Sequence, residues 1–439
     1  MKNSLDQNSL NRHELIKENE LLNTISTITE KKSMKETEAK HGNSYYYGNP
    51  EDKSISLKKL LQNVNNAEID NLYVHIPFCK TICDYCTYPK IASATEEQVI
   101  DYISKLNLEI SKHKESFKFS DLKTIHIGGG TPNFLNLKQL DKVLEIVTSG
   151  FPTQNLEELA IEVSPVGLDE NKLKLISNYK FNRISIGIQT FDDSINEQNG
   201  RKNQKAEEAI RFVEIAKKYF PNISIDLLAG QKGQTKESFS KDFEKALELD
   251  VNSIFLYQVR QVFKNGGVEE IQALNNFLNY FSFDGYEILS HNHVIKKRNS
   301  DGYCEQREGR GKMENLLGIG PGAVSEIGKY VFKNICPVKY LNEETTVDEK
   351  SIKSRTDRNL KALFIVRSLR YFIRPDTNGM LVKDYQNKFK SNPFTDFKAE
   401  LDFMKKEDLI NAAPEKIEVT SKGILFTQWM DNYLTKHYK

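Results

Sequence analysis

Three of the chain's five cysteines lie within eight residues, in the segment Cys79-Lys-Thr-Ile-Cys83-Asp-Tyr-Cys86. The segment follows directly on the apolar run Leu72–Ile76, so the sequence predicts a short loop after a strand. Three thiolates on one loop indicate a metal site, and an iron–sulfur cluster is one such site. A structural site is normally closed by four ligands, whereas three leave one metal position open to bind and activate another molecule.

Two other interpretations of the cysteines are weaker. A zinc site would need His75 or a distant residue as its fourth ligand, and zinc sites usually pair two Cys-x2-Cys units. The remaining thiols, Cys304 and Cys336, are single and far apart in the sequence. A disulfide framework is not expected, because five is an odd number and the cysteines are sparse. The cysteine usage therefore predicts a reducing compartment.

Length and composition restrict the class of protein. A chain of 439 residues is long enough for two or three domains with a large core. The formal net charge of +1 gives no sign of a polyanionic partner, so no nucleic acid is expected. No apolar stretch approaches the roughly 18 to 20 residues of a membrane span, and the first thirty residues lack the apolar centre of a signal peptide. We therefore expect a soluble, cytoplasmic protein.

From Leu72 onward, short β-branched runs alternate with amphipathic stretches, a pattern typical of βαβ units and a parallel sheet. Strands are predicted at 71–76, 122–128, 158–163, 182–188, 223–228 and 252–258. Helices are predicted between them at 96–115, 136–149, 169–178, 204–219 and 235–249. Six such units predict an α/β fold, a partial (β/α)6 TIM-like barrel whose site lies at the carboxyl ends of the strands.

The flanking regions differ from this core. Residues 1–67 are expected to be an N-terminal extension, with the first forty mostly disordered. Its three adjacent tyrosines, Tyr45–Tyr47, would pack on the barrel or cover the site. After Val347, helices at 357–372, 380–389, 396–406 and 421–436 surround a short strand at 417–420. The expected division is 1–67, a barrel over 68–345, and a mainly helical, winged-helix-like domain over 346–439.

Polar residues mark several strand ends. The second strand is followed by Gly128-Gly129-Gly130-Thr131, where glycines permit close backbone approach to a ligand. Glu162, Gln189 and Asp226 lie on or after the next three strands. Each alone could be a satisfied core group, but one polar residue per strand around a cysteine loop favours a site.

Several motifs together resemble a known family. They are Tyr-x-His-Ile-Pro-Phe-Cys-x3-Cys-x-Tyr-Cys, Gly-Gly-Gly-Thr-Pro, Arg183-Ile-Ser-Ile-Gly-Ile-Gln189, Asp226-Leu-Leu-x-Gly and Leu317-Gly-Ile-Gly-Pro-Gly-Ala-Val-Ser325. They look like the radical S-adenosylmethionine (SAM) superfamily, and within it the oxygen-independent coproporphyrinogen III oxidase group. The resemblance runs from about Tyr73 to Ser325, and more loosely to Lys439.

The resemblance implies cofactors and site residues. Cys79, Cys83 and Cys86 would hold three irons of a catalytic [4Fe–4S] cluster, and the fourth iron would bind S-adenosyl-L-methionine. Residues that would contact this first SAM molecule are Tyr73, Gly129, Glu162 and Val324. Residues that match the positions of a second SAM molecule are Gly130, Thr131, Gln189, Arg201 and Asp226. The family's chemistry is reductive cleavage of SAM to a 5′-deoxyadenosyl radical, with a flavodoxin or ferredoxin as electron donor.

The chain also departs from this group. Tyr88 occupies the position where the oxidases have a further cysteine, and Gly230-Gln231-Lys232 replaces their Gly-Leu-Pro. Three functions stay open: oxidative decarboxylation of a coproporphyrinogen III-like substrate in porphyrin biosynthesis, methyl transfer or cyclopropanation with two SAM molecules, and a haem chaperone role. His291 and His293 are more simply surface groups than ligands or acid–base residues. Arg307, Arg310 and Lys312 form a basic loop that could meet substrate carboxylates, although a solvated loop is more common, and Cys304 could lie near the site by virtue of this loop.

Overall fold

A computed structural model describes residues 52–259, 286–290, 293–296, 311–371 and 379–427, with Met430, Tyr433 and Leu434. Several predictions lie outside these residues, namely those on the first forty residues, Tyr45–Tyr47, His291, Cys304, Arg307 and Arg310. The chain divides into two compact units. One comprises Asn43–Val259 and Asn299–Leu360, and the other comprises Met1–Gly42, Arg260–Arg298 and Lys361–Lys439. The predicted three-part division stays a prediction.

The first unit contains all six predicted strands, each within two residues of its expected bounds. They are β2 Asn71–Ile76, β5 Thr124–Gly129, β6 Glu158–Val163, β7 Arg183–Gln189, β8 Asn222–Ala229 and β9 Ser253–Gln258. They lie side by side in this order, and every neighbouring pair is parallel. Their aliphatic side chains, such as Ile125, Ile161 and Ile225, are fully buried. The predicted α/β fold is confirmed.

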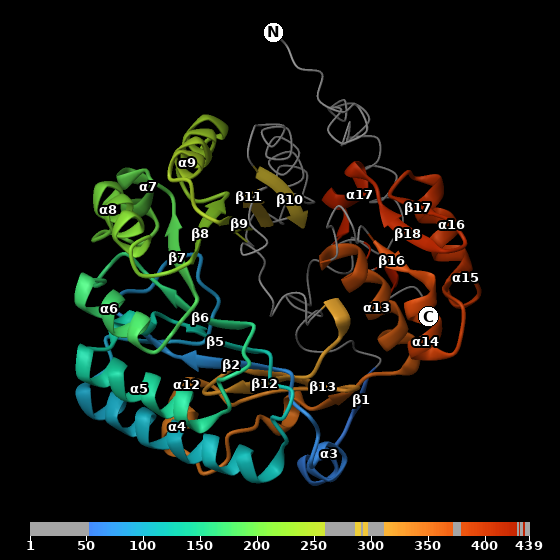
Figure 1. Cartoon of the computed structure of the whole chain (residues 1–439), viewed down its shortest axis with the longest axis horizontal. Coiled ribbons are helices and arrows are strands. Elements are labelled where there is room, and N and C mark those ends of the chain that lie inside the picture. Colours follow the sequence, from blue (N-terminus) through green and yellow to red (C-terminus); the bar gives the residue numbers. More distant parts are fainter. Residues whose placement is uncertain are drawn as a thin grey trace. The chain divides into compact units, whose positions relative to one another are not determined.

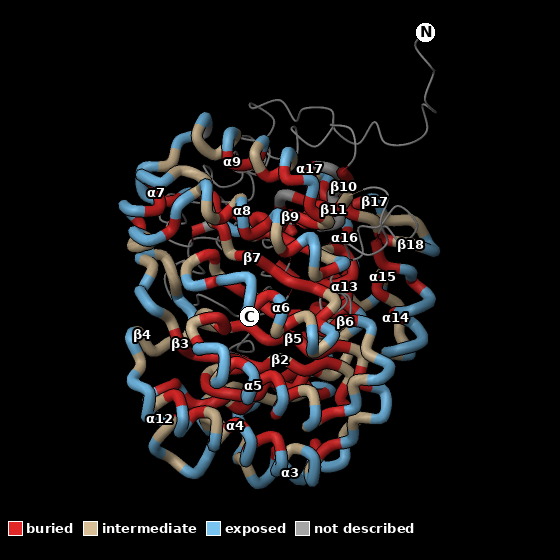
Figure 2. The backbone as a smooth tube through the Cα atoms, turned by 60° about the vertical axis from the view of Figure 1, so that its left-hand side comes forward, coloured by how far each residue is buried: buried red, intermediate tan, exposed pale blue. Residues whose placement is uncertain are grey.

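Helices connect these strands along the outside of the curved sheet (Figure 1). Their bounds are α4 Glu96–Ser116, α5 Leu137–Gly150, α6 Glu170–Asn178, α8 Ala206–Ala216 and α9 Lys236–Glu248. Side chains fix several of the starts. Thr95 and Gln98 form a capping box at α4, and Asn136 and Gln139 form one at α5. The burial colours show the buried strands of the sheet inside an envelope of helices with exposed residues (Figure 2), as expected for two packed layers.

The sheet extends beyond the six predicted strands. Strand β12 (Leu316–Ile319) pairs parallel to β2 on the side opposite β5. Strands β13 (Val324–Ile327), β14 (Tyr330–Lys333), β15 (Lys353–Ser354) and β1 (Lys53–Ser54) continue the sheet with antiparallel pairing. Sequence analysis missed these strands because they have four residues or fewer and the first two are joined by Gly320-Pro-Gly322, which resembles a loop. It also missed α3 (Leu57–Val64), capped by Ser56, α7 (Asp193–Gln198) and the two-residue strands β3 (Phe78–Cys79) and β4 (Ile91–Ala92).

The second unit contains a β10–β11 hairpin (Tyr286–Ser290 and His293–Lys296) and the C-terminal elements. Its three-stranded sheet is β16 (Met380–Leu381), β18 (Lys416–Val419) and β17 (Ile410–Ala412). Its helices are α13 (Asp357–Tyr371, which begins in the first unit), α14 (Val382–Phe389), α15 (Pro393–Asp396), α16 (Lys398–Lys406) and α17 (Ser421–Leu425). Helix α14 begins two residues later than predicted because Met380 and Leu381 pair with β18. The winged-helix assignment stays a prediction.

The remaining elements of the described chain are short. In the first unit, α12 (Pro337–Asn342) follows β14 and precedes β15. Within the described residues, no helix is long and apolar enough to cross a membrane.

Candidate functional site

The three clustered cysteines lie on a loop that is held by its own backbone. Cys79 belongs to β3, which pairs in parallel with β4, and the Ser93 N–H donates to the Cys79 carbonyl at 3.0 Å. The Cys86 N–H donates to the Cys83 carbonyl, also at 3.0 Å. All three thiols are free and partly exposed. The loop therefore presents three thiols at the carboxyl end of β2, as the sequence predicts.

The glycine segment after β5 contacts this loop. The Gly130 N–H donates to the Ile76 carbonyl at 2.8 Å, and the Thr131 N–H donates to the Phe78 carbonyl at 2.7 Å. A Cβ atom on Gly130 would lie 2.6 Å from the Phe78 carbonyl oxygen and 3.0 Å from the Cys79 sulfur. Because no side chain fits in this space, glycine at position 130 lets the backbone lie directly beside the Cys79 thiol.

Tyr73 and His75 form an aromatic pair on β2. The Tyr73 hydroxyl lies 3.1 Å from His75 Nδ1, and His75 Nε2 lies 2.8 Å from the Pro89 carbonyl oxygen. Burial lowers the pKa of His75. The ring of Tyr73 also stacks at 6.0 Å on the ring of His126 from β5. Tyr73 thereby connects β2, the strand that precedes the cysteine loop, to His126, which contacts the carboxylate described next.

Glu162 on β6 is oriented by two groups. Its carboxylate accepts from the His126 ring at 2.9 Å and from the Gly129 N–H at 3.4 Å. Burial opposes ionisation, but the hydrogen bond and charge of His126 outweigh burial and lower the pKa of Glu162. The side chain nevertheless keeps 42% of its surface exposed. Glu162 is therefore an oriented anion that a ligand can still reach.

Asp226 on β8 is a contrasting carboxyl. It accepts a hydrogen bond from the Ser185 hydroxyl at 3.1 Å. Burial, reinforced by the negative charge of Glu162, raises the pKa of Asp226 to about 7. Two carboxyls with divergent pKa values thus face the same end of the strands, one ionised and one able to hold a proton near neutral pH. Such divergence is common at functional sites.

Gln189 ends β7 in an unusual backbone conformation. Its φ of +70° lies in the left-handed region, and the pairing with β8 is interrupted between Gly187 and Gln189. The Gln231 side chain donates to the Gln189 carbonyl at 3.2 Å and to the Leu228 carbonyl at 2.9 Å. Gln231, which replaces the leucine of the oxidases' Gly-Leu-Pro, therefore helps to hold the backbone conformation of Gln189. A strained residue at a strand end is consistent with a ligand site.

Arg201 connects β7 with the cysteine loop. Its Nη1 lies 3.6 Å from the Cys83 sulfur, and its Nη2 donates to the Gly187 carbonyl at 2.7 Å. Burial alone would lower the pKa of Arg201, but Tyr85 and Cys83 raise it, so the guanidinium stays charged.

Val324 is the predicted site residue with the fewest ties to the others. Val324 begins β13, and its backbone packs closely against Gly318. A Cβ atom on Gly318 would lie 2.6 Å from the Val324 carbonyl oxygen. No contact between Val324 and the cysteine loop is described. Its role at a SAM molecule stays a prediction, as do the roles of the other predicted SAM contacts.

The residues fit the cluster by donor chemistry. Three free thiols project from one loop, and burial raises the pKa of the Cys79 thiol while Thr131 Oγ1, 3.8 Å from its sulfur, opposes the shift. Across the ranges that the structure describes, no three His, Cys, Asp or Glu side chains form a group that could hold a metal ion on its own. Thiols that each reach a different iron of a cluster need not converge on one point.

Sequence reasoning missed four polar residues of the site: Tyr85, His126, Gln204 and Asp242. His126 could have been found, since it is a polar residue inside the apolar strand Thr-Ile-His-Ile-Gly. Asp242 lies on α9 and accepts from the Thr190 hydroxyl and the Phe191 N–H, just after Gln189. No sequence signal connects a helix residue to a strand end about fifty positions earlier.

Comparison with known proteins identifies the domain. Residues 73–246 match the family model described as the Radical SAM superfamily. Over these residues the chain is similar to the radical SAM superfamily, in agreement with the resemblance of its motifs. This superfamily implies a [4Fe–4S] cluster and SAM.

Relatives with two different descriptions match most of the chain. The heme chaperone HemW of Lactococcus lactis subsp. lactis (strain IL1403) is 28% identical over 395 residues, which are 83% of this chain and 95% of the relative. The oxygen-independent coproporphyrinogen III oxidase of Escherichia coli (strain K12) is 26% identical over 389 residues, 81% of this chain and 83% of the relative. The second description is that of the group that the sequence motifs resemble.

A solved structure shows the same fold. The structure of coproporphyrinogen III oxidase (HemN) from Escherichia coli superposes with a TM-score of 0.75 at 22% identity, covering 90% of this chain and 98% of that one. The radical SAM fold is thereby confirmed. At this identity, the likeness shows the fold alone.

Proposed function

We propose that this radical SAM protein is an enzyme that abstracts hydrogen from an organic substrate, with a coproporphyrinogen III-like tetrapyrrole as the substrate class and oxidative decarboxylation as the reaction. The observation that carries the proposal is the approach of Gly130 and Thr131 to Cys79. It puts the backbone predicted to hold a second SAM molecule against a predicted cluster ligand.

The chain's own residues have separate tasks in this reaction. Cys79, Cys83 and Cys86 would hold the cluster, which with SAM supplies the 5′-deoxyadenosyl radical when bound. The Glu162 carboxylate, oriented by His126, would bind and orient a cationic group of SAM. Asp226 can donate a hydrogen bond to a ligand near neutral pH because its pKa is about 7.

A haem chaperone is the second candidate. It is favoured by the Lactococcus lactis relative, 95% of whose length aligns with this chain, and by Tyr88, which replaces the oxidases' further cysteine. Methyl transfer with two SAM molecules is a third outcome that the same test can detect.

The test is an anaerobic assay of the reconstituted and reduced protein with SAM, with and without coproporphyrinogen III. Mass spectrometry would follow 5′-deoxyadenosine, S-adenosylhomocysteine and the substrate. The enzyme proposal expects 5′-deoxyadenosine to rise with substrate, and the substrate to lose two carboxyl groups. The variant Cys83→Ala should abolish both, whereas Cys336→Ala, at an exposed cysteine, should match the wild type.

The other outcomes are distinct. S-adenosylhomocysteine formed in step with a methylated product would replace decarboxylation by methyl transfer. If the wild type does not cleave SAM, Cys83→Ala behaves in the same way, and both bind haem tightly, the enzyme proposal is wrong and the chaperone candidate stands.

A further inference from the structure

We propose that Arg201 is a positioning residue that sets the reduction potential of the cluster, by holding its positive charge against the sulfur of Cys83. The proposal rests on the proposed cluster at the three cysteines. It goes beyond the role that the family resemblance implies for Arg201, which is contact with a second SAM molecule.

The guanidinium of Arg201 is held at several points. Its Nη2 donates to the Gly187 carbonyl at 2.7 Å, and its Nε donates to Gln204 Oε1 at 3.1 Å. Gln204 is 1% exposed, and its own amide donates to the Ile188 carbonyl at 2.6 Å. The remaining nitrogen, Nη1, lies 3.6 Å from the Cys83 sulfur. Because Gly187 and Gln204 hold the other nitrogens, the charge cannot leave the sulfur without breaking these hydrogen bonds.

The backbone before Arg201 fixes the cysteine loop from the same side. The Asp84 N–H donates to the Asn199 carbonyl at 3.2 Å. Gly200 has a φ of +82°, and a Cβ at this position would lie 2.7 Å from the Ile82 carbonyl oxygen. Asn199 is 3% exposed and donates to the Lys232 carbonyl at 2.9 Å. The distance between Arg201 and Cys83 is therefore set by the packing of two backbones, in addition to their side chains.

This placement has a predictable electrostatic effect. Reduction adds one negative charge to a cluster, and the low dielectric of a buried site strengthens its attraction to a nearby cation. Hydrogen bonds to the sulfurs and the net charge around a cluster both set its potential. A guanidinium at Cys83 therefore stabilises the reduced form and raises the potential, which makes the first electron easier to deliver.

The test is a redox titration of the cluster-loaded protein, followed by electron paramagnetic resonance in the absence of SAM. Without SAM, a role in binding SAM cannot change the result. Arg201→Gln removes the charge, Arg201→Lys keeps a charge without the planar fork, and Lys202→Gln removes an exposed charge one residue away. We expect Arg201→Gln to lower the ratio of reduced to oxidised cluster about tenfold at a fixed potential, equivalent to about 59 mV for one electron. Arg201→Lys should shift less, and Lys202→Gln should match the wild type because solvent screens its charge.

A further variant covers the chance that Arg201→Gln does not fold. Gln204→Leu leaves the charge but removes its anchor, and it should shift the potential in the same direction by a smaller amount. The inference is overturned if these variants take up the cluster and titrate like the wild type, even if Arg201→Gln has lost SAM binding. A wild-type protein that takes up no cluster would overturn the proposed function as well, so the two failures are distinguishable.

Discussion

Two arginines near opposite ends of β7, Arg183 and Arg201, differ in the partner that faces them. Arg183 begins the strand, and its guanidinium lies 3.7 Å from the Glu158 carboxylate and 5.3 Å from the ring centre of Phe255. Arg201 lies beyond the other end and faces the Cys83 sulfur. The first arginine is neutralised by a carboxylate of the chain itself, whereas the second is directed at a predicted cofactor ligand. We therefore expect the charge of Arg183 to contribute to stability and, under the proposal above, the charge of Arg201 to contribute to function.

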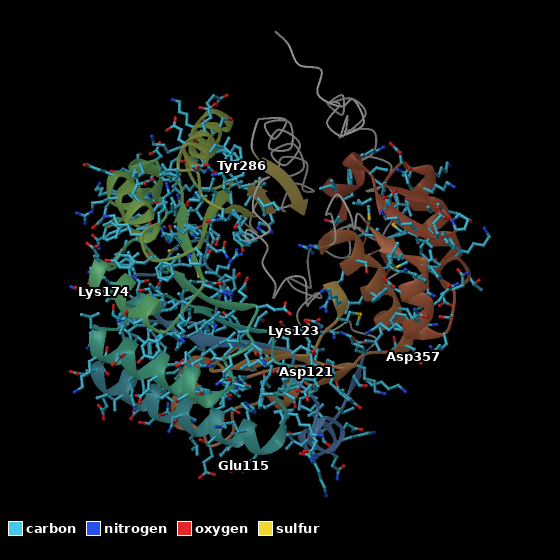
Figure 3. The ribbon with its side chains drawn as sticks, in the orientation of Figure 1. Glu115, Asp121, Lys123, Lys174, Tyr286 and Asp357 are labelled. Atoms are coloured by element: carbon cyan, nitrogen blue, oxygen red, sulfur yellow. The ribbon has the colours of Figure 1, made fainter. Side chains whose placement is uncertain are left out.

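The amino ends of the strands form mostly closed hydrogen-bond sets. The Thr124 hydroxyl donates to Asn71 at 2.7 Å, and Asp70 accepts from the Asn315 N–H at 2.8 Å. Lys123 directly precedes β5 and is labelled in Figure 3; it forms an ion pair with Glu314. The Oδ1 atom of Asn222, at the start of β8, is an exception that has no hydrogen-bond partner within the described residues.

The carboxyl ends leave more polar atoms open. Among the described residues, the buried atoms without a hydrogen-bond partner include His126 Nδ1 and Gln231 Oε1. Both belong to the site end. Since buried polar groups in proteins are normally paired, such atoms indicate a region shaped for a ligand, which agrees with where sites lie in barrels of this kind.

The largest effect is expected from breaking the pair at the amino end. Arg183→Met would remove a positively charged partner of the Glu158 side chain, which is 4% exposed. We expect the free energy of unfolding to fall by about 3–5 kcal/mol, while the cluster potential stays at its wild-type value. Denaturant unfolding under anaerobic conditions and redox titration would measure the two quantities.

A double variant tests the cause of that loss. Arg183→Met combined with Glu158→Leu replaces both charges by apolar groups, and it should recover most of the stability. If the double variant is as unstable as the single one, a change in packing rather than the loss of the ion pair causes the fall in the free energy of unfolding. A shift of the cluster potential in Arg183→Met would remove the contrast between the two arginines.

The next effect concerns Asp226, a partly buried carboxyl that has fewer hydrogen-bond donors than the buried Asp242. Asp242 accepts from Thr190, Phe191 and Gln234, whereas Asp226 accepts from Ser185. Folding raises the pKa of Asp226 from 3.8 to about 7. Asp226 therefore contributes its full stabilisation at pH values below 3.8, the pKa in the unfolded chain, and this contribution is lost as the pH rises through about 7. Between pH 5 and 8, Asp226 should therefore cost the wild type up to about 2–3 kcal/mol.

Asp226→Asn should remove this part of the pH dependence. We expect the difference in unfolding free energy between variant and wild type to change in favour of the variant as pH rises from 5 to 8. Denaturant unfolding at several pH values would measure it. A difference that does not vary with pH would mean that Asp226 titrates at an ordinary value.

Much of the fold could be predicted from the sequence, because each core strand is a β-branched run that is buried almost without interruption. Six strands between amphipathic helices were sufficient to define the barrel. The extension of the sheet through β12 and β13 was not predictable from local patterns, since Gly318 resembles a loop residue until its pairing with Tyr73 of β2 is known. There the tertiary context overrides the local preference.

The site could be predicted in part. The cysteine loop and the polar strand ends are local motifs, and they lie in one unit at the carboxyl ends of the strands. The approach of Arg201 to Cys83 joins residues 118 positions apart, and it depends on Gln204, which has no motif of its own. Contacts of this kind follow from packing, and a single sequence carries no local signal for them.

The smallest effect on stability is expected at two strained residues, one at each end of β7. Gln189 at the carboxyl end has a φ of +70°, and the exposed Lys180 before the amino end has a φ of +63°. Replacing either by glycine relieves strain but adds entropy to the unfolded chain. Each change should alter the free energy of unfolding by no more than about 1 kcal/mol.

The two glycine variants should differ in function. Lys180→Gly should bind SAM as the wild type does, whereas Gln189→Gly should bind it less tightly, because it lacks the side chain predicted to contact the second SAM molecule. Equilibrium dialysis of labelled SAM with the cluster-loaded protein would measure this, and the stoichiometry would show whether one or two molecules bind. If both variants retain wild-type affinity and stoichiometry, Gln189 does not contact SAM, and its conformation reflects only the interrupted pairing between β7 and β8.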